Sequence, residues 1–229
     1  MIRMKKTYHI TSIACIILLC LVLMVQGAYA IGEFSLGLNA GITYDPNHLE
    51  PAITQWNTQA KTTATSVEQI TIPYSFAWGI NMRYQFNYFL FRIGAHFTSP
   101  YSVRGKADAN KVTISTYQFG LPATVGLIMP LKQRTYFFIG AGITYNYAYL
   151  EWKETVPANK YRFADSIPGF HYMMGAEAPI TSKITLSVEW MHQEGRSIPI
   201  KDEIAGTTKQ TISVKGDFLL FGVNYYIPM

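Results

Sequence analysis

From Glu33 onward the sequence alternates between apolar side chains and small or polar ones, and this period of two is its most constraining feature. In the first such stretch Phe34, Leu36 and Leu38 are separated by serine and glycine. Alternation places the two kinds of side chain on opposite faces of a β-strand, whereas a helix needs apolar residues three or four apart. Apolar rows of this kind fill eight segments: 34–44, 70–86, 89–97, 119–129, 137–147, 170–178, 184–190 and 219–227. The sequence therefore predicts an all-β fold of eight strands.

The links between these segments alternate in length. Residues 45–69, 99–111, 150–166 and 194–211 are long and polar, while the turns near Asn87, at 130–134 and at 179–183 are short. This arrangement is typical of an antiparallel up-and-down meander. The alternation slips at 116–117 and at 215–219, which indicates either β-bulges or strands that continue beyond the apolar zone.

The face opposite the apolar rows distinguishes a water-soluble β-sandwich from a barrel in a membrane. A solvated face would carry many Lys and Glu, but this face is rich in glycine and small hydroxyl residues, which suit the inner wall of a narrow barrel. Aromatic residues gather at both ends of the rows, for example Tyr84 and Tyr136 near short turns and Tyr147 and Trp190 near long links. Such girdles mark transmembrane barrels, and only a closed barrel pairs every backbone group of its strands in lipid. We therefore predict an eight-stranded antiparallel up-and-down transmembrane β-barrel.

The start of the chain has the pattern of a secretory signal peptide. Three basic residues precede an apolar run from Ile10 to Val25, and an A-Y-A motif ends at Ala30. We expect cleavage after Ala30, giving a signal peptide at 1–30 and a barrel at 31–229. A membrane anchor is the alternative, although the run is short for a span. Both cysteines, Cys15 and Cys20, lie in this segment, and lipoprotein cleavage before Cys15 would leave too short an apolar run.

The charge balance gives no argument for a nucleic-acid partner. The full chain has a formal net charge of +5, but three of its 19 Lys and Arg and none of its 14 Asp and Glu lie in the predicted signal peptide. The remaining chain is therefore near neutral. Its scattered histidines have no metal-ligand spacing, so we expect neither a metal nor another cofactor.

Charged residues fall in the gaps between the apolar rows, so they should point into the barrel lumen. Counted from the short turns, five of them lie at similar depth and should form one ionic layer: Glu33, Arg83, Arg92, Glu177 and Glu189. His96 and His171 should join the polar lumen. Eight strands enclose roughly enough space for side chains alone, so the layer could act as a plug, or as a gate if its pairs rearrange.

The closing segment LFGVNYYIPM has a G-x-x-aromatic-x-apolar pattern at Gly222, Tyr225 and Ile227. With this segment and its architecture, the chain resembles the small eight-stranded outer-membrane proteins, the group containing OmpW, OmpX and the OmpA membrane domain. It is most similar to OmpW in its long first loop and ring-rich barrel. The resemblance implies an outer-membrane location, recognition of those three residues by the barrel assembly machinery, and a passive path for small apolar molecules. The chain departs from the pattern in ending on Pro228-Met229 instead of Phe.

Two functions remain open from the sequence. The first is an OmpW-like narrow pore for small, including hydrophobic, solutes; the second is a non-conducting barrel whose long loops serve adhesion or bind host or other partners. An enzyme is not expected: His96 has Ser99 and Ser102 nearby and His192 lies at another strand end, but neither has a third residue to orient it. The expected surroundings are outer-membrane lipids and the assembly machinery.

Overall fold

The computed structural model describes residues 32–132, 134–156, 158–195, 198–201 and 208–227. The predicted signal peptide with both cysteines, and the final Pro228-Met229, lie outside the described residues.

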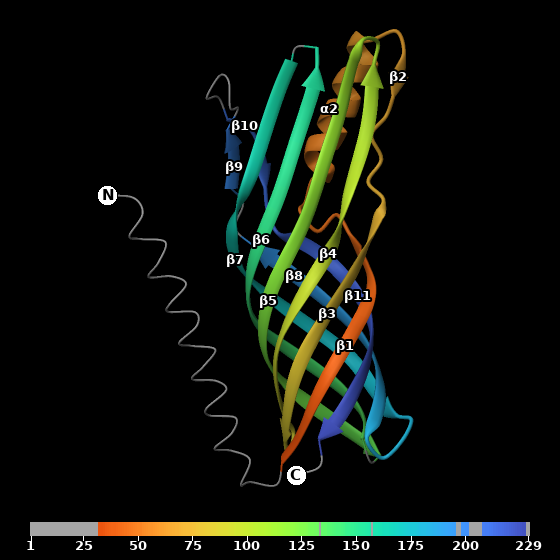
Figure 1. Cartoon of the computed structure of the whole chain (residues 1–229), viewed down its shortest axis with the longest axis vertical. Helices are drawn as coiled ribbons and strands as arrows, with labels where there is room; N and C mark the ends of the chain where they lie inside the picture. The colour runs from red at the N-terminus through yellow and green to blue at the C-terminus, as the bar shows by residue number, and fades with distance from the viewer. Residues whose placement is uncertain (1–31, 133, 157, 196–197, 202–207, 228–229) are drawn as a thin grey trace, which may run out of the picture.

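Eight antiparallel strands form a closed ring, which confirms the predicted fold class (Figure 1). Each strand pairs with the next one around the ring, and pairing of β1 with β11 and of β4 with β5 completes it. The strands are β1 (Gly32–Tyr44), β3 (Tyr74–Phe86), β4 (Phe89–Ala107), β5 (Asn110–Lys132), β6 (Thr135–Thr155), β7 (Ala158–Pro179), β8 (Ile184–Gly195) and β11 (Lys215–Ile227).

The outer face of the barrel wall is apolar and most polar side chains point inside, as the alternation predicts, although an apolar cluster also lies in the interior. Ile143 is 67% exposed, whereas its neighbour Thr144 is 3% exposed. An apolar outer surface of this kind suits acyl chains, and no backbone edge is left to be satisfied by water. In the described part of the chain, no helix has the length and apolar character needed to cross a membrane.

Four neighbouring strands continue far beyond the barrel. β4, β5, β6 and β7 have 19, 23, 21 and 22 residues, against 12 or 13 for the other four. The links predicted at 99–111 and 150–166 are therefore not irregular loops but two β-hairpins that extend the sheet (Figure 1). The sequence pattern hides this extension because the apolar residues change faces where the strands leave the apolar zone.

The change of faces occurs next to three tyrosines, Tyr117, Tyr147 and Tyr149, which we call the aromatic rim. On the barrel side of the rim, Leu121 and Ile139 of β5 and β6 belong to the outward face. Beyond it, the apolar residues Ile114 of β5 and Leu150 of β6 are inward and fully buried. The register between β5 and β6 is unbroken from Val112 to Pro130, so the slip at 116–117 is a continuing strand.

A real β-bulge lies in β4 instead. Its register with β5 shifts between Thr98 and Tyr101, where Pro100 provides no N–H for the ladder. The slip at 215–219 also belongs to a continuous strand, because β11 pairs with β8 without a break from Lys215.

The first long link contains a helix, α2 (Glu50–Thr63), and a short strand, β2 (Val67–Glu68), that pairs with β4. The Asp45 carboxylate accepts the backbone N–H of Leu49 and of Glu50, both at 2.7 Å, which anchors the start of the helix. Only a narrow stripe that includes Ile53 and Ala60 is buried, so this 14-residue helix has little apolar periodicity. The last long link holds a hairpin of β9 (Ile198–Lys201) and β10 (Thr208–Ile212).

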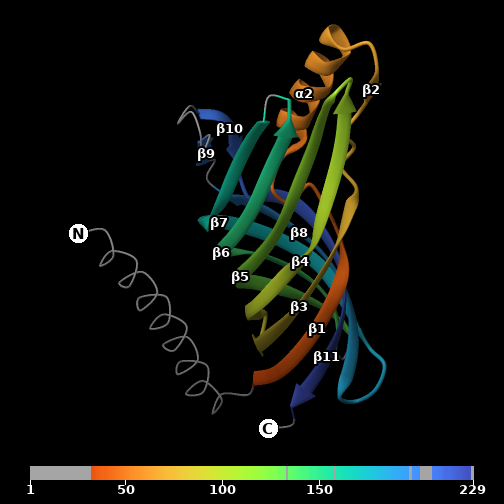
Figure 2. The ribbon, with the colours of Figure 1, turned by 45° about the horizontal axis from the view of Figure 1, so that its top comes forward.

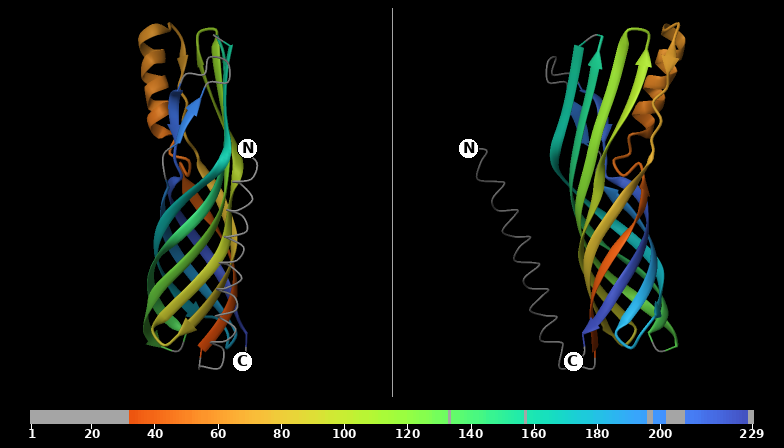
Figure 3. Two further views of the ribbon diagram at one scale, coloured as in Figure 1. Left: turned by 90° about the vertical axis from the view of Figure 1, so that its left-hand side faces the viewer. Right: turned by 45° about the vertical axis from the view of Figure 1, so that its right-hand side comes forward.

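The extended sheet and α2 form a second folded unit, which we call the surface module. The helix lies against one face of the extension, and β9 and β10 lie on the same side (Figures 2 and 3). Its core joins residues from the helix, the sheet and the barrel top: Leu49, Ile53, Ile70, Ile72, Val103, Val112, Ile114, Ala148, Leu150, Trp152, Tyr161, Ile167 and Val214. The chain thus buries an apolar core outside the membrane zone and, within it, a lumen that combines polar side chains with a second apolar cluster that includes Leu90, Phe138 and Phe218.

Candidate functional site

The lumen holds a compact ionic layer at the short-turn half of the barrel. Arg83 on β3 donates to Glu177 on β7 at 2.6 Å and also to Glu189 on β8. Arg92 on β4 donates to the other carboxylate oxygen of Glu189 at 2.6 Å. The four side chains are 0 to 6% exposed, so they fill the lumen with paired charges.

Neutral polar groups make further hydrogen bonds to these charged side chains. Arg83 Nε donates to Asn81 at 2.9 Å, and the Ser187 hydroxyl donates to Glu189 at 3.0 Å. The Glu177 carboxylate accepts from Thr185, Asn224 and Tyr226. Because buried ion pairs are stable only when such additional hydrogen bonds are made, this shell lets the layer persist in the lumen.

Aromatic rings flank the layer inside the barrel. On the short-turn side, Gln85, Tyr136 and Tyr226 hydrogen-bond to one another. The guanidinium of Arg83 also lies 5.6 Å from the ring centre of Phe138, which is 1% exposed. Apolar and aromatic groups therefore pack directly around the paired charges.

Glu33 is not part of the ionic layer, and this prediction is wrong. It pairs in register with Gln85, one lumen-facing position closer to the barrel end than Arg83. Its carboxylate instead accepts from Arg134 in the β5–β6 turn at 2.8 Å, and its side chain is 45% exposed. Alternation gives the face of a residue but not its depth in a barrel of tilted strands.

The two lumen histidines lie where the alternation places them. His171 Nε2 is 2.8 Å from the Thr124 hydroxyl, and His96 packs its ring against Phe218 at 5.2 Å between centres. Both are buried, at 1% and 4% exposure. Among the described residues, neither ring nitrogen of His96 has a hydrogen-bond partner in the protein. Buried polar groups of this kind normally bind water, so we expect this part of the lumen to be hydrated.

The other end of the lumen is covered by the link that enters α2. The Asn47 side-chain amide donates to the Thr116 hydroxyl of β5, on the opposite part of the ring from β1. Asn47 and Leu49 are 0% and 1% exposed, and Leu49 packs into the core of the surface module together with Val214. The ionic layer and this cover therefore occupy two different levels of the barrel.

The two histidines considered for catalysis lie in different surroundings, and His192 has the carboxylate neighbour that the sequence did not indicate. His96 is inside the lumen. His192 stands on the outer wall, where it stacks on Tyr172 at 4.9 Å and its Nδ1 lies 2.9 Å from Asp217. Its Nε2 faces Glu194 at 3.6 Å. Both of its ring nitrogens thus face carboxylates, in a ring-rich belt near the barrel end.

The predicted assembly residues lie on β11, the last strand. Tyr225 and Ile227 point outward and are 45% and 37% exposed, whereas Gly222 points into the lumen against Ser187. The side chains of Tyr225 and Ile227 can therefore be contacted from outside the barrel, whereas Gly222 faces the lumen.

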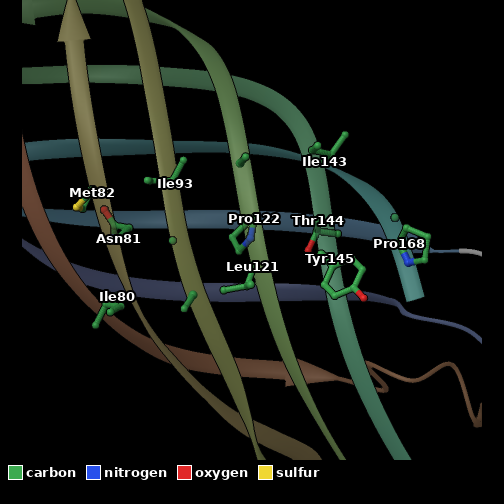
Figure 4. Close-up of a pocket in the computed structure, with 14 residues that line it drawn as sticks. Ile80, Asn81, Met82, Ile93, Leu121, Pro122, Ile143, Thr144, Tyr145 and Pro168 are labelled. Carbon is green, nitrogen blue, oxygen red and sulfur yellow. The ribbon is translucent and has the colours of Figure 1, made fainter. Parts of the chain in front are cut away.

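The outer wall has an apolar hollow of about 470 Å³ that crosses strands β3 to β7 (Figure 4). Short outward side chains at Ala95 and Ala123 lie between larger ones at Ile80, Ile93 and Ile143. The hollow belongs to the lipid-facing wall, where acyl chains fill such irregularities, so we do not assign it a solute.

Sequence reasoning missed a polar groove in the surface module. The groove has a volume of about 440 Å³ and lies between α2 and the hairpin ends. Its lining combines two aromatic residues, Trp56 and Tyr161, with hydrogen-bonding side chains. These are Gln55, Gln59 and Thr63 from the helix, and Asn110 and Glu154 from the hairpins. The sequence gives no signal for this groove. Its lining residues are far apart in the chain, and the helix that contributes several of them has no clear apolar periodicity.

The closed ring, the lipid-facing wall and the polar lumen define an integral β-barrel membrane protein. The chain belongs to the family described as outer membrane protein beta-barrel domain, whose model matches residues 13–226. It is therefore an outer-membrane protein. No curated protein matches the chain by sequence.

Solved barrel structures resemble the fold at low sequence identity. OprG of Pseudomonas aeruginosa is 11% identical with a TM-score of 0.54, and the match covers 87% of this chain and 99% of OprG. Neisserial surface protein A is 14% identical with a TM-score of 0.43, covering 84% and 96% of the two chains. Ail of Yersinia pestis is 9% identical with a TM-score of 0.45, covering 86% and 99%. At this identity the OprG match supports the fold alone.

Proposed function

We propose that this protein is a non-conducting outer-membrane barrel that presents the surface module to a binding partner. The observation that carries the proposal is the buried ionic layer: Arg83, Glu177 and Glu189 are paired across the lumen with 0% side-chain exposure. The cover at Asn47 and Leu49 closes the other end. A barrel closed at two levels has its accessible chemistry on the surface.

The polar groove is the proposed binding site. Side-chain amides donate and accept hydrogen bonds, a carboxylate accepts them, and the half-buried ring of Trp56 offers an apolar face beside them. This combination suits a polyhydroxylated ligand, such as a neutral glycan on a host or neighbouring cell. The groove is presented on a rigid sheet and helix, as is common for binding loops on stable scaffolds.

Planar-bilayer conductance of the refolded mature chain, residues 31–229, tests the closed lumen. We expect the wild type to be silent and the Arg83→Ala and Glu177→Ala variants to leak, because each removes part of the ionic layer. Lys153→Ala, on the outer face of the surface module, is the matched control and should remain silent. Discrete conductance steps in the wild type would contradict the proposal.

A narrow pore is the second candidate function. The unpartnered ring nitrogens of His96 favour it, because a hydrated stretch of lumen is part of what a solute path needs. In that case the ionic layer acts as a gate, and the wild type conducts with steps that Arg83→Ala alters. The same conductance experiment therefore separates the two candidates.

Binding of arrayed host glycans by the purified protein tests the groove. We expect the double variant Gln55→Ala/Gln59→Ala to lose binding, since both amides line the groove. Thr54→Ala/Thr58→Ala changes exposed residues of the same helix outside the groove lining and should bind like the wild type. Equal binding by all three proteins would show that the groove is not the binding site.

A further inference from the structure

The extended sheet has a second face, opposite α2, that carries a concentration of positive charge. Along the described residues of β4 to β7 beyond the aromatic rim, the outward positions include six basic side chains and one acidic side chain, Glu151. The basic residues are Arg104, Lys106, Lys111, Lys153, Lys160 and Arg162. We call them the basic face. The chain without its predicted signal peptide is near neutral, so this concentration does not follow from composition.

The register places these residues in successive rows above the rim. Glu151 pairs with Arg162 in the first row, and Lys153 pairs with Lys160 in the second. Arg104 joins the second row through Thr113, and Lys106 pairs with Lys111 in the third. Rows two residues apart are separated by roughly 7 Å along a strand, so the basic face begins about one row beyond the aromatic rim.

Two carboxylates neutralise part of this face: Glu151, and Glu68 of the neighbouring strand β2, which pairs in register with Lys106. Glu151 pairs with Lys153 at 2.5 Å and with Lys160 at 3.3 Å. Arg162 lies over the Tyr149 ring at 5.6 Å. Arg104 and Lys111 make no ion pair with any described residue, whereas Lys106 has Glu68 as its cross-strand neighbour and interacts with Asp108 in the β4–β5 turn. Like charges this close repel one another, and a multivalent anion would relieve that repulsion.

The position of the basic face identifies the anion. Its strands are those of the lipid-facing wall, and the rim between the two zones lies at the level where aromatic girdles meet lipid headgroups. The helix and the β9–β10 hairpin are on the other side of the sheet, so the described elements leave this side open to the membrane surface (Figure 3). A neighbouring lipid reaches the face without leaving the bilayer.

We propose that the basic face docks the phosphate-bearing headgroups of outer-leaflet glycolipid. Arg162 meets the headgroup nearest the rim, and Arg104 with its neighbours meets phosphates attached to the sugars above. Bound glycolipid then holds the surface module upright beside the membrane. The inference is independent of whether the lumen conducts.

The test measures glycolipid binding by the full-length chain purified in detergent. The probes are fluorescent lipopolysaccharide, the same lipid after enzymatic dephosphorylation, and soluble heparin. The test variant is Arg104→Gln/Arg162→Gln, and the control is Lys61→Gln/Lys183→Gln, which removes the same charge from α2 and from a short turn. Heat-modifiable electrophoresis verifies that every variant remains folded.

We expect the test variant to bind phosphorylated lipopolysaccharide about 30-fold more weakly, since each basic group near an anionic surface contributes about a factor of five. Dephosphorylation should weaken binding by the wild type to a similar extent, and added salt should weaken the phosphorylated complex. The control variant should match the wild type. Equal affinity for dephosphorylated lipid, or an equal loss in the control, would overturn the proposal. Heparin binding as tight as that of the phosphorylated lipid would overturn it in favour of a soluble polyanion.

Discussion

Strands β4 to β7 have opposite polarity on the two sides of the aromatic rim. Within the barrel, Ile143 of β6 points outward and is 67% exposed, while Thr144 points inward and is buried. Beyond the rim on the same strand, Lys153 points outward and Trp152 is buried at 1% exposure. The β5–β6 register does not break between the two zones. The comparison shows that one continuous sheet can extend from lipid into water. Its apolar side chains lie on the outward face within the barrel and on the inward face beyond the rim, and the strands do not turn.

Charge follows the same division. The lumen charges are buried in pairs, so each is stabilised by its partner. The charges of the basic face are exposed, so they can be substituted at little cost in stability. Substitutions should therefore have large effects inside the barrel and small ones on the module surface.

The largest expected effect is from Gly142→Arg in the barrel wall. A side chain at this position would fall directly against the Ala123 carbonyl of β5, so the wall cannot close around it. We expect no heat-resistant folded band on electrophoresis. Gly126→Arg should behave likewise, because its added atom would lie 2.5 Å from the Ile139 carbonyl. Thr63→Arg at the exposed end of α2 should fold normally, and equal loss in all three variants would contradict the assignment of faces.

Arg83→Ala should be the next most damaging change. It leaves Glu177 and Glu189 buried without their main partner, which costs about 3 to 5 kcal/mol of unfolding free energy. Urea titration in detergent measures this loss. Lys153→Ala removes an exposed member of a surface pair and should cost less than about 1 kcal/mol. Comparable losses would mean that the ionic layer is not desolvated.

Ile53→Ala should separate the surface module from the barrel. Ile53 is 3% exposed in the module core, and its truncation should destabilise the docking of α2 by about 2 to 5 kcal/mol. Limited trypsin digestion should then cut faster after Lys61, while the heat-resistant barrel persists. Thr54→Ala, at the neighbouring exposed position, serves as control. Loss of the barrel together with the helix would show that the two units are not separable.

The smallest expected effect concerns the tie between α2 and the β4–β5 turn. The Thr65 hydroxyl and the backbone N–H groups of Thr65 and Ser66 donate to Asp108, and these bonds lower the pKa of its carboxyl. A lowered pKa means that the tie is fully present above about pH 4 and is lost as the pH falls through the folded value. Hydrogen exchange of the end of α2, corrected for intrinsic rates, should therefore accelerate slightly at low pH. Asp108→Asn should remove this pH step, and an unchanged step would assign it to another group.

The sequence predicted the barrel well because one physical signal governs it. Alternation fixes which residues face lipid, so the eight strands and the inward direction of Arg83, Arg92, Glu177 and Glu189 follow directly. It failed for Glu33, because depth in the lumen depends on strand tilt and on the turn that supplies Arg134. Face and depth are separate properties of a barrel residue.

The surface module was missed for a different reason. Its strands have many Lys, Thr and Asn on the outward face, and their apolar residues appear on the face that is polar within the barrel. Without the register of the neighbouring strand, this exchange resembles the end of a strand. The groove also needs Gln59 and Glu154 to meet across a distance in sequence that no local pattern reports.

Labelling of single cysteines on β6 tests the change of polarity at the rim most directly. Lys153→Cys, Ile143→Cys and Leu150→Cys would each be treated on intact cells with a membrane-impermeant maleimide and, separately, with a lipid-soluble one. We expect the impermeant reagent to label only Lys153→Cys, the lipid-soluble reagent to label Ile143→Cys as well, and Leu150→Cys to resist both. Labelling of Ile143→Cys by the impermeant reagent, or of Lys153→Cys only after the cells are opened, would contradict a sheet that passes from lipid to the outer surface at the aromatic rim.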